Sequence, residues 1–300
     1  MEIRERNELI TNSDKLIKNF LDYIDVSDKT VHEYGVGIKS FIAYCNENNI
    51  TDVSRQDVIN FRESLKKDGK KATTINLYLS SIKSFFKWLE YAEVYKNITS
   101  NVKSFRIERS HSREAFTLDE VKTILNNCQN DKEKIMVLLA INCGLRCNEI
   151  CNIKLDDFQI KEGKNCLYVL GKARQGLKQD FVVVDDRTFQ SIKDYVNQNN
   201  IKDYLFTSES NHNKGGMVTP KTLRLMFNNI LERCGLKDSK HTFHSTRHTN
   251  ATLSIQNGVD IREVSQNLRH KNINTTMIYL HDIEAINNKC SSVVSNLIGC

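Results

Sequence analysis

The stretch LRHKNINTTMIY, residues 268–279, ends on a tyrosine placed nine positions after a histidine. Tyr279 has Met277, Ile278 and Leu280 as neighbours, and a tyrosine among apolar residues is more often part of a core than a catalyst. Taken alone, the segment favours packing. Its other role, that of a nucleophile, depends on the polar residues that precede it along the chain.

The segment HSTRH, residues 244–248, places a histidine and an arginine three positions apart. On a helix, His244 and Arg247 share a face, so both can contact one phosphate. His244 and His248 are four apart, which is also a spacing of zinc ligands. Arg247 between them would repel a cation and neither neighbour is a glutamate, so the phosphate interpretation is favoured and no metal is expected.

The segment GLRCNE, residues 144–149, pairs a glycine that ends one helix with an arginine that opens the next. A helix N-terminus attracts anions, and Arg146 adds a bidentate fork for phosphate. Glu149 lies three residues further on and can hold the guanidinium group in place. The simpler interpretation is a surface salt bridge at a helix turn.

A fourth segment carries Lys172 after an apolar strand, in a polar turn with Arg174 and Lys178. A lysine on a hairpin turn can reach into a cleft as a proton donor. Exposed lysines on hairpins are common, so this signal is weak by itself.

Together the four segments resemble the tyrosine recombinase family, also called the phage integrase family. The catalytic residues of that family follow the order arginine, lysine, histidine-x-x-arginine, histidine or tryptophan, and tyrosine. This sequence has those residue types in that order, at Arg146, Lys172, His244, Arg247, His270 and Tyr279. One position departs from the family pattern: the usual glycine before the second histidine is Arg269. The arginine restricts the backbone there or adds a phosphate contact.

The resemblance implies a site-specific DNA recombinase. Tyr279 would attack a phosphodiester, form a 3′-phosphotyrosine and release a 5′-hydroxyl. Arg146 and Arg247 would bind the non-bridging oxygens, and His270 would add a hydrogen bond to the same phosphate. His244 would assist proton transfer at the tyrosine, and Lys172 would protonate the leaving oxygen. The chemistry needs no ATP, no metal and no other cofactor.

Two other functions compete with recombination. A type IB topoisomerase uses the same chemistry, but the small helical first domain favours a recombinase. A non-enzymatic, helix-rich DNA-binding regulator accounts for the basic charge but not for the ordered set of catalytic residue types.

A mainly helical protein is expected, because the chain has one proline and 12 glycines among 300 residues. With the resemblance, the expected fold is mainly α with a small antiparallel β-sheet. Four or five amphipathic helices fill residues 1–105, with Ser27 and Ser54 as N-caps. This region resembles the helical core-binding, SAM-like domain of the family. A polar linker at 106–114 precedes the catalytic domain, 115–300, whose first helix opens with a capping box at Thr117. Short strands are expected at 153–155, 166–170 and 181–184.

The net charge of +6 suggests a polyanionic partner without establishing one. A basic turn at 66–71 contains a glycine and four lysines. It is either a solvated loop or a grip on phosphates, with two threonines at the start of the next helix suited to backbone contacts. The expected DNA-binding residues are Lys66, Lys67, Lys70, Lys71, Thr73, Thr74 and Arg174.

The remaining expectations concern partners and location. The N-terminus lacks a signal peptide, the apolar run 135–141 is too short to span a membrane, and nine cysteines without a Cys-x-x-Cys pair disfavour both disulfides and a zinc ribbon. A cytoplasmic protein is expected. The resemblance points to a Xer-type or simple transposon recombinase without an arm-binding domain, acting on double-stranded DNA with an inverted-repeat site. It would assemble as a homotetramer, or as a heterotetramer with a related recombinase, through a C-terminal exchange helix at 284–298.

Overall fold

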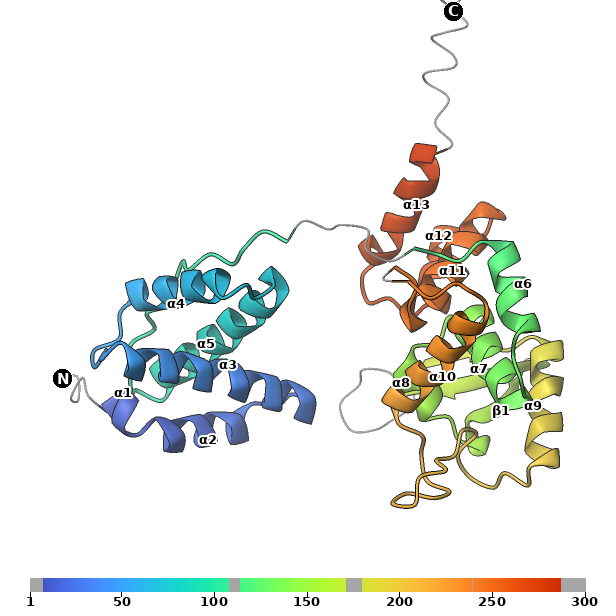
Figure 1. Cartoon of the computed structure of the whole chain (residues 1–300), viewed down its shortest axis with the longest axis horizontal. Coiled ribbons are helices and arrows are strands. Elements are labelled where there is room, and N and C mark those ends of the chain that lie inside the picture. Colours follow the sequence, from blue (N-terminus) through green and yellow to red (C-terminus); the bar gives the residue numbers. More distant parts are fainter. Residues whose placement is uncertain (1–7, 108–113, 171–179, 239, 287–300) are drawn as a thin grey trace, which may run out of the picture. The chain divides into compact units, whose positions relative to one another are not determined.

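The computed structural model describes residues 8–107, 114–170, 180–238 and 240–286. The chain divides into two compact units, Met1–Ser110 and His111–Cys300, which are both drawn in Figure 1. Each unit has its own hydrophobic core. The expected fold class is confirmed: the described residues are mainly helical, with one small antiparallel sheet.

The first unit is built from helices because its apolar residues recur at helical spacing and its turns carry caps. Its helices are α1 (Glu8–Thr11), α2 (Ser13–Tyr23), α3 (Asp28–Glu47), α4 (Arg55–Lys67) and α5 (Ala72–Tyr91). Ser27 accepts a hydrogen bond from the Thr30 N–H (3.4 Å), and the Ser54 N–H donates to Asp57 (2.8 Å). Both predicted N-caps are confirmed.

Phenylalanine rings fill the core of this unit. Phe41 of α3 packs edge-on against Phe61 of α4 and Phe86 of α5. Gly37 lies where α3 meets α5, and a Cβ atom there would lie 2.3 Å from Ser81 Oγ. Glycine therefore permits the close approach of the two longest helices of the unit.

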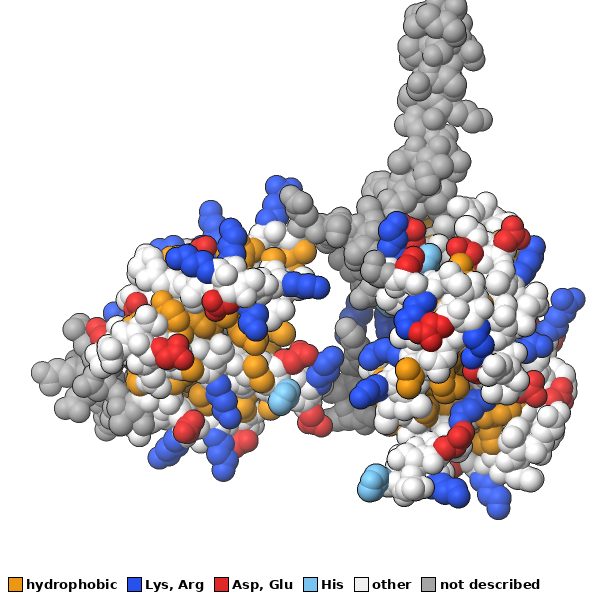
Figure 2. All heavy atoms as spheres, viewed as in Figure 1, with side chains coloured by type: hydrophobic (Ala, Val, Ile, Leu, Met, Phe, Trp, Pro, Cys, Tyr) orange, Lys and Arg blue, Asp and Glu red, His pale blue; other side chains and the backbone are white. Residues whose placement is uncertain are grey.

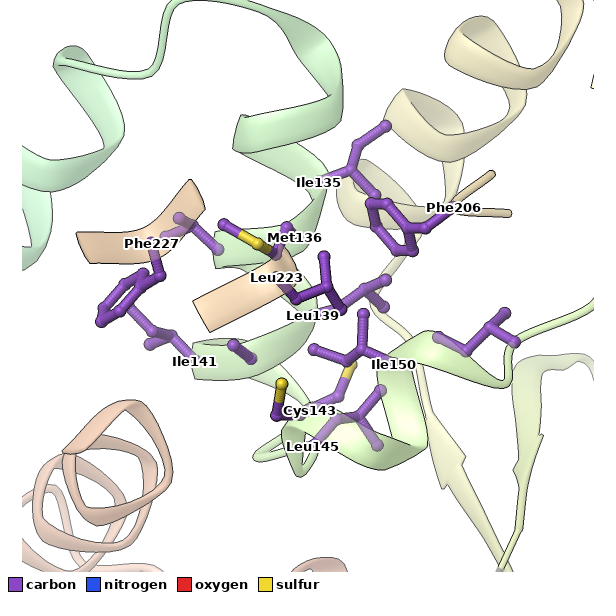
Figure 3. Close-up of a cluster of buried hydrophobic side chains, with 14 of the residues drawn as sticks. Ile135, Met136, Leu139, Ile141, Cys143, Leu145, Ile150, Phe206, Leu223 and Phe227 are labelled. Atoms are coloured by element: carbon purple, nitrogen blue, oxygen red, sulfur yellow. The ribbon is translucent and has the colours of Figure 1, made fainter. Parts of the chain in front are cut away.

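The second unit begins with α6 (Leu118–Asn126), α7 (Asp131–Asn142) and α8 (Cys147–Cys151). The predicted capping box is present, since the Thr117 N–H donates to Glu120 (2.7 Å). Helix α7 is apolar on nearly all sides, as expected for a core helix, and Figure 3 shows its Ile135, Met136 and Leu139 among buried side chains from neighbouring elements. The turn from α7 to α8 is therefore anchored to the core at both ends.

The sheet joins β1 (Phe158–Lys161), β2 (Lys164–Val169) and β3 (Asp180–Val183) in the order β1-β2-β3, all antiparallel. The second and third predicted strands are confirmed, but the first prediction was wrong. Residues 153–155 form a single bridge, Lys154 to Tyr204, before a 3-10 turn at Leu155–Asp157. The strand starts later because Glu162 and Gly163, both at positive φ, form the two-residue turn that sets the register of the hairpin.

The rest of the unit returns to helix with α9 (Asp186–Gln198), α10 (Pro220–Arg233), α11 (Phe243–Gln256), α12 (Ile261–Asn267) and α13 (Asn274–Ile286). Helix α11 packs against both α7 and α13. Ala251, Val264, Leu268 and Tyr279 form a small buried cluster of their own. This packing brings residues 244–248 next to both the α7–α8 turn and the C-terminal tyrosine.

Candidate active site

The turn before α8 orients Arg146 through Glu149. Gly144 has φ +58, and a Cβ there would lie 2.5 Å from a methyl group of Leu268, so glycine is required for both conformation and space. The Arg146 N–H donates to Glu149 Oε2 (2.7 Å), and Arg146 Nη1 donates to Glu149 Oε1 (2.7 Å). The Glu149 side chain is 7% exposed. The expected contact between Glu149 and the Arg146 guanidinium is present, and it involves a buried carboxylate.

Arg247 is a deeply buried charge, only 1% exposed. Its Nη1 donates to the Gly144 carbonyl (2.7 Å), and its Nη2 donates to the Leu268 carbonyl. A buried guanidinium needs such partners because desolvation is costly. Burial, with the nearby charges of Arg146 and Arg269, lowers the pKa of Arg247 to about 9, so the group stays charged at neutral pH. The two carbonyls fix its orientation between the α7–α8 turn and the turn after α12.

His270 is held by a residue of the next helix. Its Nδ1 lies 2.7 Å from Thr276 Oγ1. Burial lowers the pKa of His270 to about 4, and the charges of Arg247, Arg146 and Arg269 act in the same direction. The ring is therefore neutral near pH 7. An anion that neutralises these arginines would favour its protonated form.

Tyr279 is buried, 9% exposed, on α13. Its ring meets the edge of His248 with the ring centroids 5.2 Å apart, and His248 meets His244 at 4.9 Å. Burial raises the pKa of Tyr279, although Arg247 and Arg146 act to lower it. The phenol is thus protonated in the free protein, and nucleophilic attack would need a proton acceptor.

Arg269 occupies the position where the resemblance leads one to expect glycine, and its φ of +53 is left-handed. For a residue with a Cβ, this conformation costs roughly 1–2 kcal/mol. Its Nη2 donates to Glu149 Oε2 (2.8 Å) and its Nη1 to the Asn267 carbonyl (2.6 Å). Its buried Nε has no hydrogen-bond partner among the described residues, which costs a further ~1–3 kcal/mol. Arg269 thus adopts, at an energetic cost, a backbone conformation that favours glycine.

A pocket opens beside these groups. It includes the start of α8, a residue of α10 and the start of α11, and therefore two helix N-termini and three arginines. Its lining residues are Leu145, Arg146, Cys147, Asn148, Arg224, Thr242, Phe243, His244 and Arg247. Such a pocket attracts an anion, and two of its arginines are held in position by Glu149 and by backbone carbonyls.

Several predicted residues lie elsewhere. Lys172 and Arg174 fall outside the described residues. In the first unit, the four lysines of the basic turn and Thr73 are exposed and Thr74 is half-buried. Asn76 pairs with both backbone groups of Phe105, and Lys66 Nζ lies 5.4 Å from the centre of the Phe105 ring. The basic turn is thus accessible for phosphate contacts, which stay a prediction.

Sequence analysis did not assign three residues to the site. His248 contacts the Tyr279 ring, Thr276 holds His270, and Arg224 lines the pocket. His248 and Thr276 lie within the segments 244–248 and 268–279, so their closeness in the sequence to the predicted site residues could have indicated a role in the site. Arg224 is one of several arginines on polar helix faces, and its role depends on how α10 packs against α8.

The cysteines beside Arg146 pack as expected. Cys143, Cys147 and Cys151 are buried, and Cys147 Sγ donates to the Pro220 carbonyl (3.4 Å).

Across the described ranges, no group of three or more His, Cys, Asp or Glu side chains could hold a metal ion. Helices long and apolar enough to cross a membrane are likewise absent from the part of the chain that the structure describes.

The arrangement defines a class of protein. Two fixed guanidinium groups and His244 line a pocket whose charge suits an anion, and a protonated tyrosine lies on α13, which packs against α11. These groups suit phosphoryl transfer to tyrosine, in which positioned cations stabilise the charge that develops on phosphate.

Comparison with known proteins shows the family. Residues 114–285 match the phage integrase family, and residues 17–93 match the phage integrase N-terminal SAM-like domain. A tyrosine recombinase of Thermosipho africanus is 30% identical over 281 residues, 89% of this chain and 95% of that protein. Tyrosine recombinase XerA of Pyrococcus horikoshii is 28% identical, covering 92% of both chains. The chain belongs to the phage integrase family of tyrosine recombinases, as the resemblance predicted.

Solved structures agree on the fold. XerH recombinase in a post-cleavage complex with palindromic difH substrate has a TM-score of 0.77 at 17% identity and covers 98% of both chains. A lambda integrase tetramer bound to a Holliday junction has a TM-score of 0.67 at 18% identity, covering 90% of this chain and 76% of that one. The chain is accordingly a DNA strand-transferring enzyme of site-specific recombination. The topoisomerase and regulator alternatives are not favoured.

Proposed function

We propose that this enzyme recombines DNA at an inverted-repeat site through a covalent bond between Tyr279 and the 3′-phosphate. The observation that carries the proposal is the placement of Tyr279, on a helix packed against α11, where the charges of Arg247 and Arg146 act on its hydroxyl. A buried tyrosine with two cationic neighbours can form a phenolate at the moment of attack.

The scissile phosphate occupies the pocket in this mechanism. Arg146 and Arg247 bind its non-bridging oxygens, and His270 donates a hydrogen bond to the same group once the bound phosphate offsets the arginine charges. Glu149, Gly144 and Leu268 hold the two guanidinium groups in place. The binding energy is thus concentrated where negative charge grows in the transition state.

The chemical step involves two proton transfers, one from Tyr279 and one to the leaving oxygen. The Tyr279 hydroxyl loses its proton to the histidine pair, with His244 as acceptor and His248 as the ring between it and the tyrosine. The phenolate oxygen bonds to phosphorus, and the bond from phosphorus to the 5′-oxygen breaks. Lys172 supplies the proton to that leaving oxygen. A 5′-hydroxyl from a partner duplex then attacks in reverse, and no metal or ATP takes part.

We also propose the partners. Double-stranded DNA with inverted repeats suits this family, because XerH was solved on a palindromic substrate and lambda integrase as a tetramer on a Holliday junction. Four subunits, identical or from a related recombinase, would assemble on two sites in the cytoplasm. Arg174, the four lysines of the basic turn (Lys66, Lys67, Lys70 and Lys71), and Thr73 and Thr74 at the start of α5 would contact the DNA backbone.

The Tyr279→Phe variant tests this proposal. It should bind its DNA site like the wild type and form no covalent adduct with a nicked suicide substrate, because it lacks the nucleophilic oxygen. Gel electrophoresis under denaturing conditions detects the adduct. Wild type should form the adduct in EDTA, whereas a strict magnesium requirement or an adduct in Tyr279→Phe would contradict the mechanism.

A further inference from the structure

Arg269 is the feature of the site that the mechanism leaves unused. It adopts a left-handed backbone conformation and has a buried Nε without a partner among the described residues. A residue kept in such a position calls for a functional explanation. The contacts of its guanidinium group supply one.

Glu149 divides its two oxygens between two arginines. Oε1 accepts from Arg146 Nη1 at 2.7 Å, and Oε2 accepts from Arg269 Nη2 at 2.8 Å. Oε2 also accepts from the backbone N–H of Arg146 at 2.7 Å. The carboxylate is therefore held both by the turn before α8 and by the turn that leads to His270.

The three charged side chains of Arg146, Glu149 and Arg269 differ in their exposure to solvent. The side chains of Glu149 and Arg269 are 7% and 6% exposed, whereas that of Arg146 is 34% exposed and lines the pocket. A lone Glu149 would neutralise Arg146 and weaken its attraction for phosphate. A second buried guanidinium offsets the carboxylate, so one net positive charge stays beside the pocket.

Arg269 itself does not line the pocket. Its effect on phosphate therefore passes through Glu149. We propose that Arg269 is a positioning residue for DNA cleavage, which holds Glu149 through Oε2 and so keeps Arg146 oriented and its charge available to the scissile phosphate. This inference rests on the proposed role of Arg146 at that phosphate.

Three variants at position 269 test whether the arginine charge is needed for DNA cleavage. Arg269→Gly restores the residue that the left-handed backbone favours, so it should fold. Arg269→Met keeps the length without the charge, and Arg269→Lys keeps the charge. The assay is single-turnover cleavage of a nicked suicide substrate at saturating DNA, with equilibrium binding and thermal unfolding measured alongside.

Cleavage should fall about 10-fold in Arg269→Gly and Arg269→Met, well short of the roughly 100-fold loss typical of one direct transition-state contact. Arg269→Lys should recover most of the rate, and DNA affinity should change little in all three. In a Glu149→Gln background, Arg269→Gly should have little further effect, because both changes remove the same interaction. Unchanged cleavage in Arg269→Gly, an equal loss in Arg269→Lys, or additive effects would overturn the proposal.

A readout without DNA keeps this test separate from the proposed function. The charges that face His270 are Arg146, Arg247 and Arg269, with His248 also near. In Arg269→Gly the pKa of His270, followed by histidine NMR, should move toward its usual value, and in Arg269→Lys it should not. If the pKa of His270 is the same in Arg269→Gly as in the wild type, the inference is contradicted. If the wild-type protein forms no covalent DNA adduct at Tyr279, the proposed function is contradicted.

Discussion

At the scale of single residues, the site depends on guanidinium groups that are fixed before DNA arrives. Arg247 has two backbone carbonyl partners, and Arg146 has a buried carboxylate. Fixed donors need no reorganisation during the reaction, which is why such groups contribute much to catalysis. The same arrangement makes the identity of each cation important.

Arg146→Lys should lose far more cleavage than binding. Lysine keeps the charge, but it cannot bind Glu149 and a phosphate with one planar fork. The loss of one such contact costs about 3 kcal/mol, or roughly 100-fold in rate. Single-turnover cleavage and equilibrium binding measure the two effects. Arg187→Lys, at an exposed arginine of α9, serves as the control, and equal losses of binding and cleavage would contradict the prediction.

His270 should make the fold sensitive to acid. Its pKa is about 4 in the folded protein, against 6.5 for a free histidine. The unfolded chain therefore binds more protons between these values, so stability is full above pH 6.5 and is lost as the pH falls toward 4. The effect is on the order of 2 kcal/mol once the partial exposure of the ring is allowed for.

Urea denaturation across this pH range measures that effect. The His270→Gln variant should show a weaker loss of stability toward acid, because the glutamine side chain does not titrate. His212→Gln, at an exposed histidine, is the matched control. An acid dependence that is the same in all three proteins would show that other groups cause it.

At the scale of elements, the basic turn between α4 and α5 is the clearest candidate for sequence-independent DNA contact. Its four lysines are exposed around Gly69, which has φ +74. Figure 2 shows Lys and Arg side chains on the drawn face of each unit, so surface charge alone does not single out this turn. The turn is distinguished by its position at the N-terminus of α5, because the backbone N–H groups there can bind phosphate together with the lysines.

Changing Lys66, Lys67, Lys70 and Lys71 to alanine should weaken DNA binding and flatten its salt dependence. Each lost phosphate contact reduces the slope of log affinity against log salt by about 1. The control removes four other exposed lysines of the same unit, Lys15, Lys18, Lys87 and Lys96. Titration at several salt concentrations measures the slopes, and equal slopes for the two variants would identify the turn as a solvated loop.

At the scale of the whole molecule, the chain consists of two units with separate hydrophobic cores. The residues expected to be catalytic lie in the second unit, whereas the basic turn lies in the first. We expect several subunits to act together in recombination, joined by the exchange helix expected at 284–298. Most of that segment lies outside the described residues, so the exchange remains a prediction.

Deleting residues 284–300 should spare binding to a single site but abolish the synapse of two sites and recombination. The reason is that, in the proposed assembly, a head-to-tail exchange of one helix would close the ring of four subunits. Native gels distinguish single-site complexes from synapses, and a two-site plasmid reports recombination. A truncated protein that still recombines at the wild-type rate would show that this helix does not mediate assembly.

The sequence by itself determined the helical class, the helix caps and the order of the catalytic residue types. These features are local: Ser27, Ser54 and Thr117 bond within three residues of themselves, and hydrophobic periodicity needs no distant partner. The first strand was misplaced because a two-residue turn at Glu162 and Gly163, rather than β propensity, set its register.

Only the tertiary structure decided how the site is held together. The Arg247 carbonyl partners lie 103 and 21 residues away in the chain, and Arg269 reaches Glu149 across 120 residues. Likewise, Arg224 joins the pocket only through the packing of α10 against α8. Such contacts form only when the folded backbone brings together residues that are far apart in the chain. Burial then strengthens the electrostatic interactions between these groups.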